Sequence, residues 1–223
     1  MLWVMMRPST MTQLDQDLQD INASLVRMLS QVREACELAR RALVESDMAA
    51  AERCVENDAR IDAMQATLEL RILTVIARRQ PAAGDLRFLG AAYQSLADIE
   101  RAGDYAEHVA RSAVTLAERP PLKKYLDMAR ILEVLGGMID TTMKSVAESD
   151  IDAARRAHAM DREIDDLYEQ IQRELLTYMI EDPETIGRAT QLLAVARYLE
   201  RLGDHLENVD EHVMFWLTGE RPA

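Results

Sequence analysis

Residues 199–204 read LERLGD, and one hundred residues earlier residues 99–104 read IERAGD. The likeness extends outward from this motif, since residues 45–47 and residues 148–150 both read ESD. The two likenesses are 100 and 103 residues apart, and a sequence that resembles itself at a nearly constant spacing contains a duplicated structural unit. We therefore expect the chain to hold two copies of one unit.

The spacing of apolar residues is that of α-helices. Apolar residues recur from Leu192 to Trp216 at alternating steps of three and four, which is the spacing of a bundle-packing face. Prolines fall where helices are expected to end, and Pro120 and Pro121 separate the two copies. The chain is rich in Ala, Leu and Met and poor in Gly and Pro, as packed helices are. The sequence predicts an all-α fold of two tandem three-helix bundles, related by approximate internal two-fold symmetry and without strands.

We expect helices over residues 12–46, 48–80, 82–118, 122–148, 151–181 and 184–218. The corresponding domains are a flexible N-terminal leader at residues 1–11, a first repeat at 12–118 and a second repeat at 122–218.

The composition excludes several classes of function. The formal net charge of -13 argues against a nucleic-acid partner, which would need clustered Lys and Arg. The longest internal run without charge, residues 88–97, is far shorter than the roughly 20 residues that span a bilayer, so we expect a soluble protein without membrane insertion. Cys36 and Cys54 have no metal or disulfide spacing and are interpreted as reduced thiols. With no nucleophile and base arrangement, we do not expect an enzyme.

Carboxylates four residues apart recur in both copies. The pairs are Asp58 and Asp62, Glu100 and Asp104, Asp161 and Asp165, and Glu200 and Asp204. Each pair shares one face of a helix, where like charges cost about 0.2–0.5 kcal/mol per pair unless cations neutralise them. Such carboxylate sets suit magnesium, manganese, iron or zinc.

One further helical step beyond the third-helix pairs reaches His108 in the first copy and Asn208 in the second. Both are candidate additional metal ligands, as are Glu107 and Glu207.

The same spacing also fits a solvated acidic face, since Glu200 and Asp204 lie more than about 100° from the apolar seam. Two features favour a metal site. Gly103 and Gly203 occupy helix interiors, at a cost of about 1 kcal/mol each relative to Ala, which indicates close approach of backbone or ligand. The acidic pattern is also retained in both copies.

The chain resembles the PhoU family. The resemblance is carried by RQP at residues 79–81, DLR at 85–87, IERAGD at 99–104 and ARYLERLGD at 196–204, and it runs from about Leu18 to Gly219. It implies a cytoplasmic negative regulator of phosphate uptake and of the phosphate-starvation (Pho) response. Such a protein is expected to act as an adaptor between the ATPase subunit of the phosphate ABC importer and a sensor histidine kinase, and to form a homodimer.

The resemblance also implies that the paired acid-x-x-x-Asp motifs hold multinuclear metal, one cluster per repeat. The matching positions are the eight carboxylates above. Because His108 in the first repeat corresponds to Asn208 in the second, the two sites are expected to differ in affinity or metal. Arg87, Arg101 and Arg201 match family motifs as well, and we favour local salt bridging over phosphate binding for them.

Two alternatives stay open. One is a metal-free structural adaptor whose acidic faces bind basic partner surfaces. The other is an enzyme of the di-iron helical-bundle class, which needs Glu-x-x-His on two helices. None of the four histidines has a glutamate three residues before it, which disfavours the enzyme.

Overall fold

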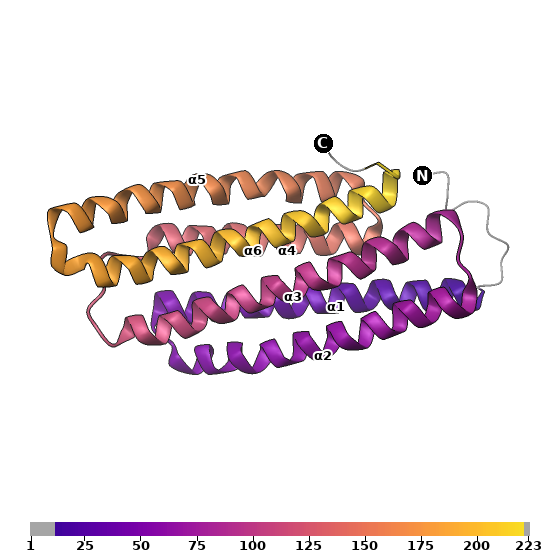
Figure 1. Cartoon of the computed structure of the whole chain (residues 1–223), viewed down its shortest axis with the longest axis horizontal. Helices are drawn as coiled ribbons and strands as arrows, with labels where there is room; N and C mark the ends of the chain where they lie inside the picture. Colours follow the sequence, from indigo (N-terminus) through magenta and orange to yellow (C-terminus); the bar gives the residue numbers. More distant parts are fainter. Residues whose placement is uncertain (1–11, 221–223) are drawn as a thin grey trace.

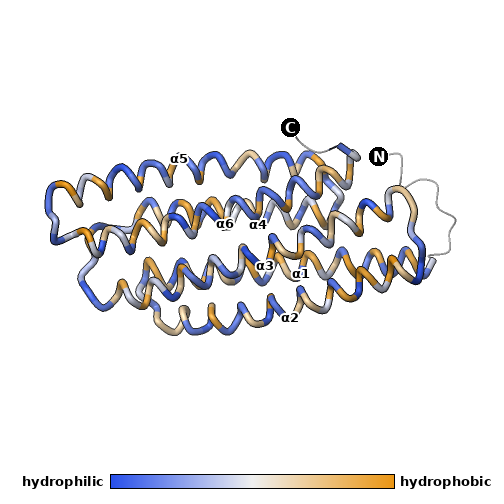
Figure 2. The backbone as a smooth tube through the Cα atoms, in the orientation of Figure 1, coloured by the Kyte–Doolittle hydropathy of each residue, from blue (hydrophilic) through white to orange (hydrophobic). Residues whose placement is uncertain are grey.

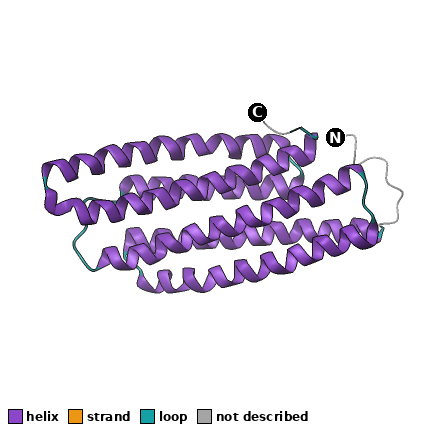
Figure 3. Ribbon diagram, in the orientation of Figure 1, coloured by secondary structure: helices purple, strands orange, loops and turns teal. Residues whose placement is uncertain are grey.

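The computed structural model describes residues 12–220, and the expected N-terminal leader lies outside this range. Six α-helices and one 3-10 turn account for almost all of it, and residues 12–220 contain no strand, so the all-α prediction is confirmed (Figures 1 and 3). The elements are α1 (Gln13–Glu45), α2 (Met48–Arg79), α3 (Ala83–Ala117), α4 (Leu126–Glu148), α5 (Ile151–Glu181), η2 (Pro183–Thr185) and α6 (Ile186–Thr218).

α4 begins later than the sequence pattern suggested. The expected start was residue 122, but the helix begins at Leu126. The chain that leaves Pro120 and Pro121 runs as a linker, and the ammonium group of Lys123 pairs there with Asp127 and with Glu174 of α5. This linker connects the last helix of the first repeat to the first helix of the second (Figure 1).

The repeated ESD motif forms the same tight turn twice. Ser46 and Ser149 take the left-handed conformation that ends α1 and α4, with φ of 56° and 55°. The following aspartates, Asp47 and Asp150, then accept hydrogen bonds from backbone N–H groups at the start of α2 and α5. Such N-caps stabilise a helix by about 1 kcal/mol. A short signal in the sequence therefore specifies two helix reversals.

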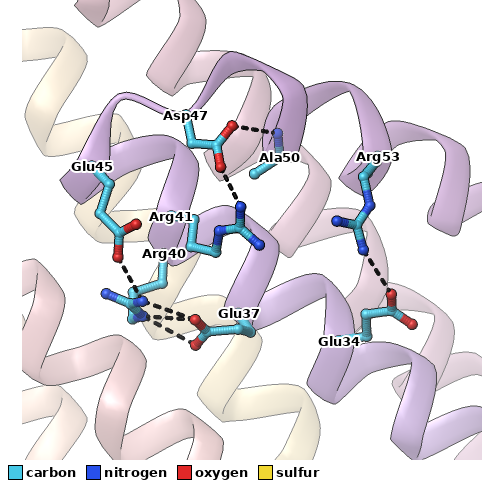
Figure 4. Close-up of polar contacts among 8 residues, drawn as sticks. All are labelled: Glu34, Glu37, Arg40, Arg41, Glu45, Asp47, Ala50 and Arg53. Carbon is cyan, nitrogen blue, oxygen red and sulfur yellow. Dashed lines mark hydrogen bonds and ion pairs between the residues drawn. The ribbon is translucent and has the colours of Figure 1, made fainter.

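Ion pairs support the first of these turns (Figure 4). Arg41 donates to Asp47, whose other oxygen accepts the Ala50 N–H at 3.0 Å. Nearby, Arg53 of α2 lies 3.4 Å from Glu34 of α1. Arg53 and Glu34 are exposed, so their pair contributes at most about 1 kcal/mol, whereas Arg41 and Asp47 are half-buried.

The helices lie roughly along one long axis, with α2 and α5 on the outside (Figure 1). Among the elements of residues 12–220, α2 packs on α1 and α3, and α5 packs on α4, α6 and η2. The two repeats meet through the pairs α3 with α6 and α1 with α4. The third helix of each repeat therefore lies at the centre of the molecule and carries the Glu-Arg-x-Gly-Asp motif.

Apolar side chains from all six helices form one continuous core. The predicted α6 seam from Leu192 to Val213 is buried, and Trp216 at its end is partly buried and meets Phe88 of α3 at 4.8 Å between ring centroids. Figure 2 shows apolar positions alternating with polar ones along each helix. Burial of one Leu or Ile side chain stabilises the fold by about 1.5–3 kcal/mol, so this core holds the two repeats together.

Candidate metal centres

Glycines in the centre of α3 and α6 let the neighbouring helices come close. A Cβ atom added to Gly103 would lie 2.8 Å from Cδ1 of Ile61 on α2. A Cβ atom on Gly203 would lie 2.5 Å from Oδ1 of Asp161 on α5. Real Cβ atoms do not come this close to a neighbour, so a larger residue at either position would force the neighbouring side chain or helix to shift. The close approach expected from the sequence is therefore present, and the neighbour is a side chain of the adjacent helix.

This approach brings carboxylates of two helices together in each repeat. The repeat-1 acidic cluster consists of Asp58 and Asp62 of α2 and Asp104 of α3. The repeat-2 acidic cluster consists of Asp161 and Asp165 of α5 and Asp204 of α6. In each cluster one oxygen from every member lies within 4.8 Å of the others. Six of the predicted ligands are thus grouped as the spacing suggested.

Burial and mutual repulsion disturb these carboxyl groups. Burial raises the pKa of Asp58 to about 6, and the charge of Asp104 adds to the effect. Burial likewise raises the pKa of Asp161 to about 7, with Glu207 as the next cause. The pKa of Glu100 and of Glu200 also rises, through burial first and then the neighbouring aspartate. Without a cation, each cluster resists full ionisation near neutral pH.

Some of these oxygens also lack a hydrogen bond. Among residues 12–220, Oδ1 of Asp58, Oδ1 of Asp161 and Oε2 of Glu200 are buried and have no hydrogen-bond partner in the protein. An unsatisfied buried acceptor costs about 1–3 kcal/mol, more when charged. A bound cation would satisfy these atoms, so the donor set fits a hard or borderline metal ion.

The motif arginines partly neutralise the carboxylates beside them. Arg101 lies 3.0 Å from Asp104 and 3.8 Å from Glu100. Arg201 lies 3.5 Å from Asp204 and 3.9 Å from Glu200. The local salt bridges expected for these two arginines are therefore present. Both guanidinium groups are solvent-exposed at the edge of the clusters.

His108 and Asn208 lie elsewhere, which corrects their assignment as candidate ligands. The exposed ring of His108 packs beside the rings of Tyr198 and Tyr105, with centroids 5.2 Å and 6.0 Å away. Asn208 donates to Oδ1 of Asp98 at 3.1 Å. One helical step beyond Asp104 and Asp204 leads to the contact between α3 and α6, and away from α2 and α5.

Glu107 and Glu207 face the clusters instead. The charge of Glu107 contributes to the raised pKa of Asp58, and that of Glu207 to the raised pKa of Asp161. These positions lie three residues, rather than four, after the cluster aspartates. Because a helical turn has 3.6 residues, positions three and four residues after an aspartate both lie near its face of the helix. Only the packing of α2 on α3 and of α5 on α6 decides which of the two positions faces the cluster.

A polar contact between the two repeats was not predicted from the sequence. Asp98 of α3 accepts hydrogen bonds from His205, Asn208 and His212 of α6, at 2.9, 3.1 and 3.1 Å. Burial alone would raise the pKa of Asp98, but these hydrogen bonds outweigh it and hold the pKa below its usual range. His212 of the second repeat therefore has its partner in the first repeat.

Comparison with known proteins identifies the family that has this architecture. The family model described as the PhoU domain matches the chain twice, over residues 25–113 and 122–213. The chain belongs to the PhoU family. A PhoU relative from Deinococcus radiodurans, named as a phosphate-specific transport system accessory protein PhoU homolog, is 43% identical and covers 93% of this chain and 98% of its own length. A homolog of the same name from Aquifex aeolicus is 38% identical over 83% of this chain and 84% of its own length.

Solved PhoU structures have the same fold. The crystal structure of PhoU from Pseudomonas aeruginosa superposes with a TM-score of 0.89 at 33% identity, covering 93% of this chain and 100% of the other. The phosphate transport system regulatory protein PhoU from Streptococcus pneumoniae superposes with a TM-score of 0.87 at 26% identity, covering 95% and 100%. Within residues 12–220 of this PhoU-family chain, every helix is too short or too polar to cross a membrane.

Proposed function

We propose that this PhoU-family chain is a non-catalytic regulator of phosphate transport, acting in the cytoplasm by binding protein partners. The observation that carries the proposal is the double match of the PhoU domain together with relatives named as accessory proteins of a phosphate-specific transport system. Its partners in this proposal are the ATPase subunit of the phosphate ABC importer and a sensor histidine kinase. It restrains phosphate uptake and starvation-gene expression when phosphate is plentiful.

The shape of the molecule suits an adaptor. The two repeats lie side by side, each with its own acidic cluster and its own outer helix (Figure 1). The outer faces of α2 and α5 lie away from the inter-repeat contact and are free for partners. A homodimer is part of the proposal, and measurement of the mass in solution tests it.

The regulatory proposal is tested in a strain that lacks every PhoU paralogue. Expression of phosphate-starvation genes is expected to be high even in rich phosphate, and to fall when this chain is restored. A pull-down from phosphate-replete cells, with partner identification, should recover the importer ATPase or the kinase. If the strain represses its genes normally and the chain changes neither uptake nor expression, the proposal is wrong.

We further propose that each acidic cluster holds metal. In the first repeat the ligands are Asp58, Asp62 and Asp104, with Glu100 alongside. In the second they are Asp161, Asp165 and Asp204, with Glu200 alongside. The support is the set of buried oxygens without a partner and the raised pKa of Asp58 and Asp161. Bound metal would neutralise the clusters and tie α2 to α3 and α5 to α6.

The metal proposal is tested by measuring bound metal in protein purified without chelator. The double variant Asp104→Ala/Asp204→Ala is expected to lose it while keeping its helical circular dichroism signal. The charge-matched control Glu56→Gln/Glu181→Gln changes exposed acids on α2 and α5 and should retain it. Unchanged metal content in the double variant would refute these ligands, and absence of metal from wild type would instead favour the metal-free adaptor.

A further inference from the structure

The linker that joins the two repeats lies at the end of the molecule where α3 ends and α6 begins (Figure 1). A small polar cavity lies beside this linker. Its volume is about 140 Å³. It is lined by the end of α3, by the linker and by the first turns of α6. The lining residues that carry donors are Thr115, Arg119, Tyr125, Arg188 and Gln191.

Two guanidinium groups at this cavity have no carboxylate partner among residues 12–220. Arg188 donates only to the carbonyl oxygen of Pro120, at 3.3 Å, and Arg119 forms no ion pair with a described residue. Most arginines of the described chain do pair with carboxylates, as expected at a net charge of -13. Arg119 and Arg188 are exceptions to this pattern, and both line the same cavity. They create a local positive charge within an acidic protein.

Neutral donors complete the lining. Burial raises the pKa of Tyr125, against an opposing effect of the Arg188 charge, so the hydroxyl keeps its proton and can donate a hydrogen bond. Thr115 and Gln191 add a hydroxyl and an amide. Glu118 also lines the cavity, and its negative charge opposes that of the arginines, but it forms no ion pair with either of them.

We propose that this cavity binds a phosphate group, held by Arg119 and Arg188 with help from Tyr125. A guanidinium fork matches a phosphate oxygen pair and can bind it through two parallel hydrogen bonds. The volume exceeds the roughly 30 Å³ share of one water molecule several-fold but falls below the ~300 Å³ of a drug-sized ligand site. It therefore suits one tetrahedral oxyanion.

A larger hollow adjoins the small cavity and could hold the rest of a ligand that carries a phosphate group. Its volume is about 680 Å³, and it shares Arg119 and Tyr125 with the small cavity. Leu43, Val44 and Leu126 give it an apolar lining, and Lys124, which has no ion pair among the described residues, stands at its rim. The shared chemistry is thus a phosphate group, either free or attached to a larger body such as a nucleotide. This site lies outside the acidic clusters and goes beyond the regulatory function proposed above.

Binding is tested by isothermal titration calorimetry on full-length protein in the presence of EDTA. EDTA chelates metal ions, so phosphate cannot bind through a metal in the acidic clusters. The probes are inorganic phosphate and ADP. Wild type is expected to bind inorganic phosphate, and the Arg119→Gln/Arg188→Gln variant should bind it at least ~10-fold more weakly. If ADP binds more tightly than phosphate and Leu126→Ser weakens ADP alone, the ligand uses both hollows. Equal affinity for the two probes assigns the small cavity to free phosphate.

The control variant is Arg78→Gln, which removes an exposed arginine of α2 that also forms no described ion pair and lines a different hollow. It should bind phosphate like wild type. Loss of binding in Arg78→Gln with retention in the double variant would overturn the assignment, as would absence of phosphate and ADP binding by wild type at millimolar concentration. The variant Arg119→Lys/Arg188→Lys controls for loss of binding through misfolding. It keeps both positive charges and should bind phosphate with intermediate affinity. Phosphate should also raise the Tm of wild type but not of Arg119→Gln/Arg188→Gln.

Discussion

Gly203 occupies a helix interior for a reason that becomes visible at the scale of single atoms. The space where its Cβ would stand is filled by a carboxylate oxygen of Asp161, 2.5 Å away. At Gly103 the corresponding space is taken by the flexible end of Ile61, at 2.8 Å. An isoleucine methyl group can move aside more easily than a buried carboxylate in a crowded cluster. The two glycines therefore differ in how strictly they are required.

We expect Gly203→Ala to destabilise the protein by about 1–3 kcal/mol, because Asp161 or the helix must move. Gly103→Ala should cost less. Gly90→Ala is the matched control, since a Cβ at Gly90 of α3 would meet nothing within 4 Å. It should stabilise by about 0.5–1 kcal/mol through the better helix propensity of alanine. Denaturant unfolding measures all three, and a cost for Gly90→Ala equal to that of Gly203→Ala would contradict this account.

The raised pKa of Asp161, about 7, makes a further prediction at this scale. The folded protein holds this proton more tightly than the unfolded chain, whose aspartate has an ordinary pKa near 3.8. The associated stability is fully present below about pH 4 and is lost as the pH rises through 7. Metal-free protein is therefore expected to have a falling Tm between pH 5 and 8.

Asp161→Asn should flatten this pH dependence. Asp166→Asn, which changes an exposed acid on the same helix, serves as control and should leave it almost unchanged. Differential scanning calorimetry in EDTA gives the comparison. If both variants show the wild-type slope, the ionisation of Asp161 does not govern it.

At the scale of helices, neighbouring residues of each ESD turn have different roles: one adopts a special backbone conformation and the next caps a helix with its side chain. Ser149 adopts a positive φ of 55°, which favours glycine, whereas Asp150 caps α5 through its side chain. We expect Ser149→Gly to be neutral or stabilising by up to about 1 kcal/mol, and Asp150→Ala to destabilise by about 1 kcal/mol. Thermal unfolding distinguishes them. Shifts of the same sign would show that the turn does not depend on these two local conformations.

For the whole molecule, the question is what holds one repeat against the other. Besides the apolar contact of α3 with α6, Asp98 receives three hydrogen bonds from α6. A second polar contact joins α1 to α4, where Arg33 lies 3.3 Å from an exposed Asp140. The first contact is partly buried and the second is more exposed, so they should contribute unequally.

We expect Asp98→Ala to cost about 1–3 kcal/mol, because three partly buried donors lose their acceptor. Asp140→Ala should cost less than about 1 kcal/mol, as exposed ion pairs do. Equilibrium unfolding of both variants tests the difference. A cost for Asp98→Ala no greater than that of Asp140→Ala would show that the repeats are held together by apolar packing alone.

Much of this architecture could be predicted because its signals are local. Helix lengths follow from the spacing of apolar residues, and the tight turns follow from the ESD motif. The duplicated motif at residues 99–104 and 199–204 led to the family. The carboxylates spaced four residues apart led to six aspartates that do lie together. Within one helix, spacing alone specifies which side chains share a face, and this holds before any tertiary contact forms.

The tertiary structure alone decided what lies across from each face. Glu107 rather than His108 faces the repeat-1 acidic cluster because α2 packs against that side of α3. Asp98 meets His205 and His212 because α3 and α6 cross between the repeats, more than one hundred residues apart in sequence. The rotation and depth of packed helices depend on the fit of all their side chains at once. No spacing within a single helix contains that information.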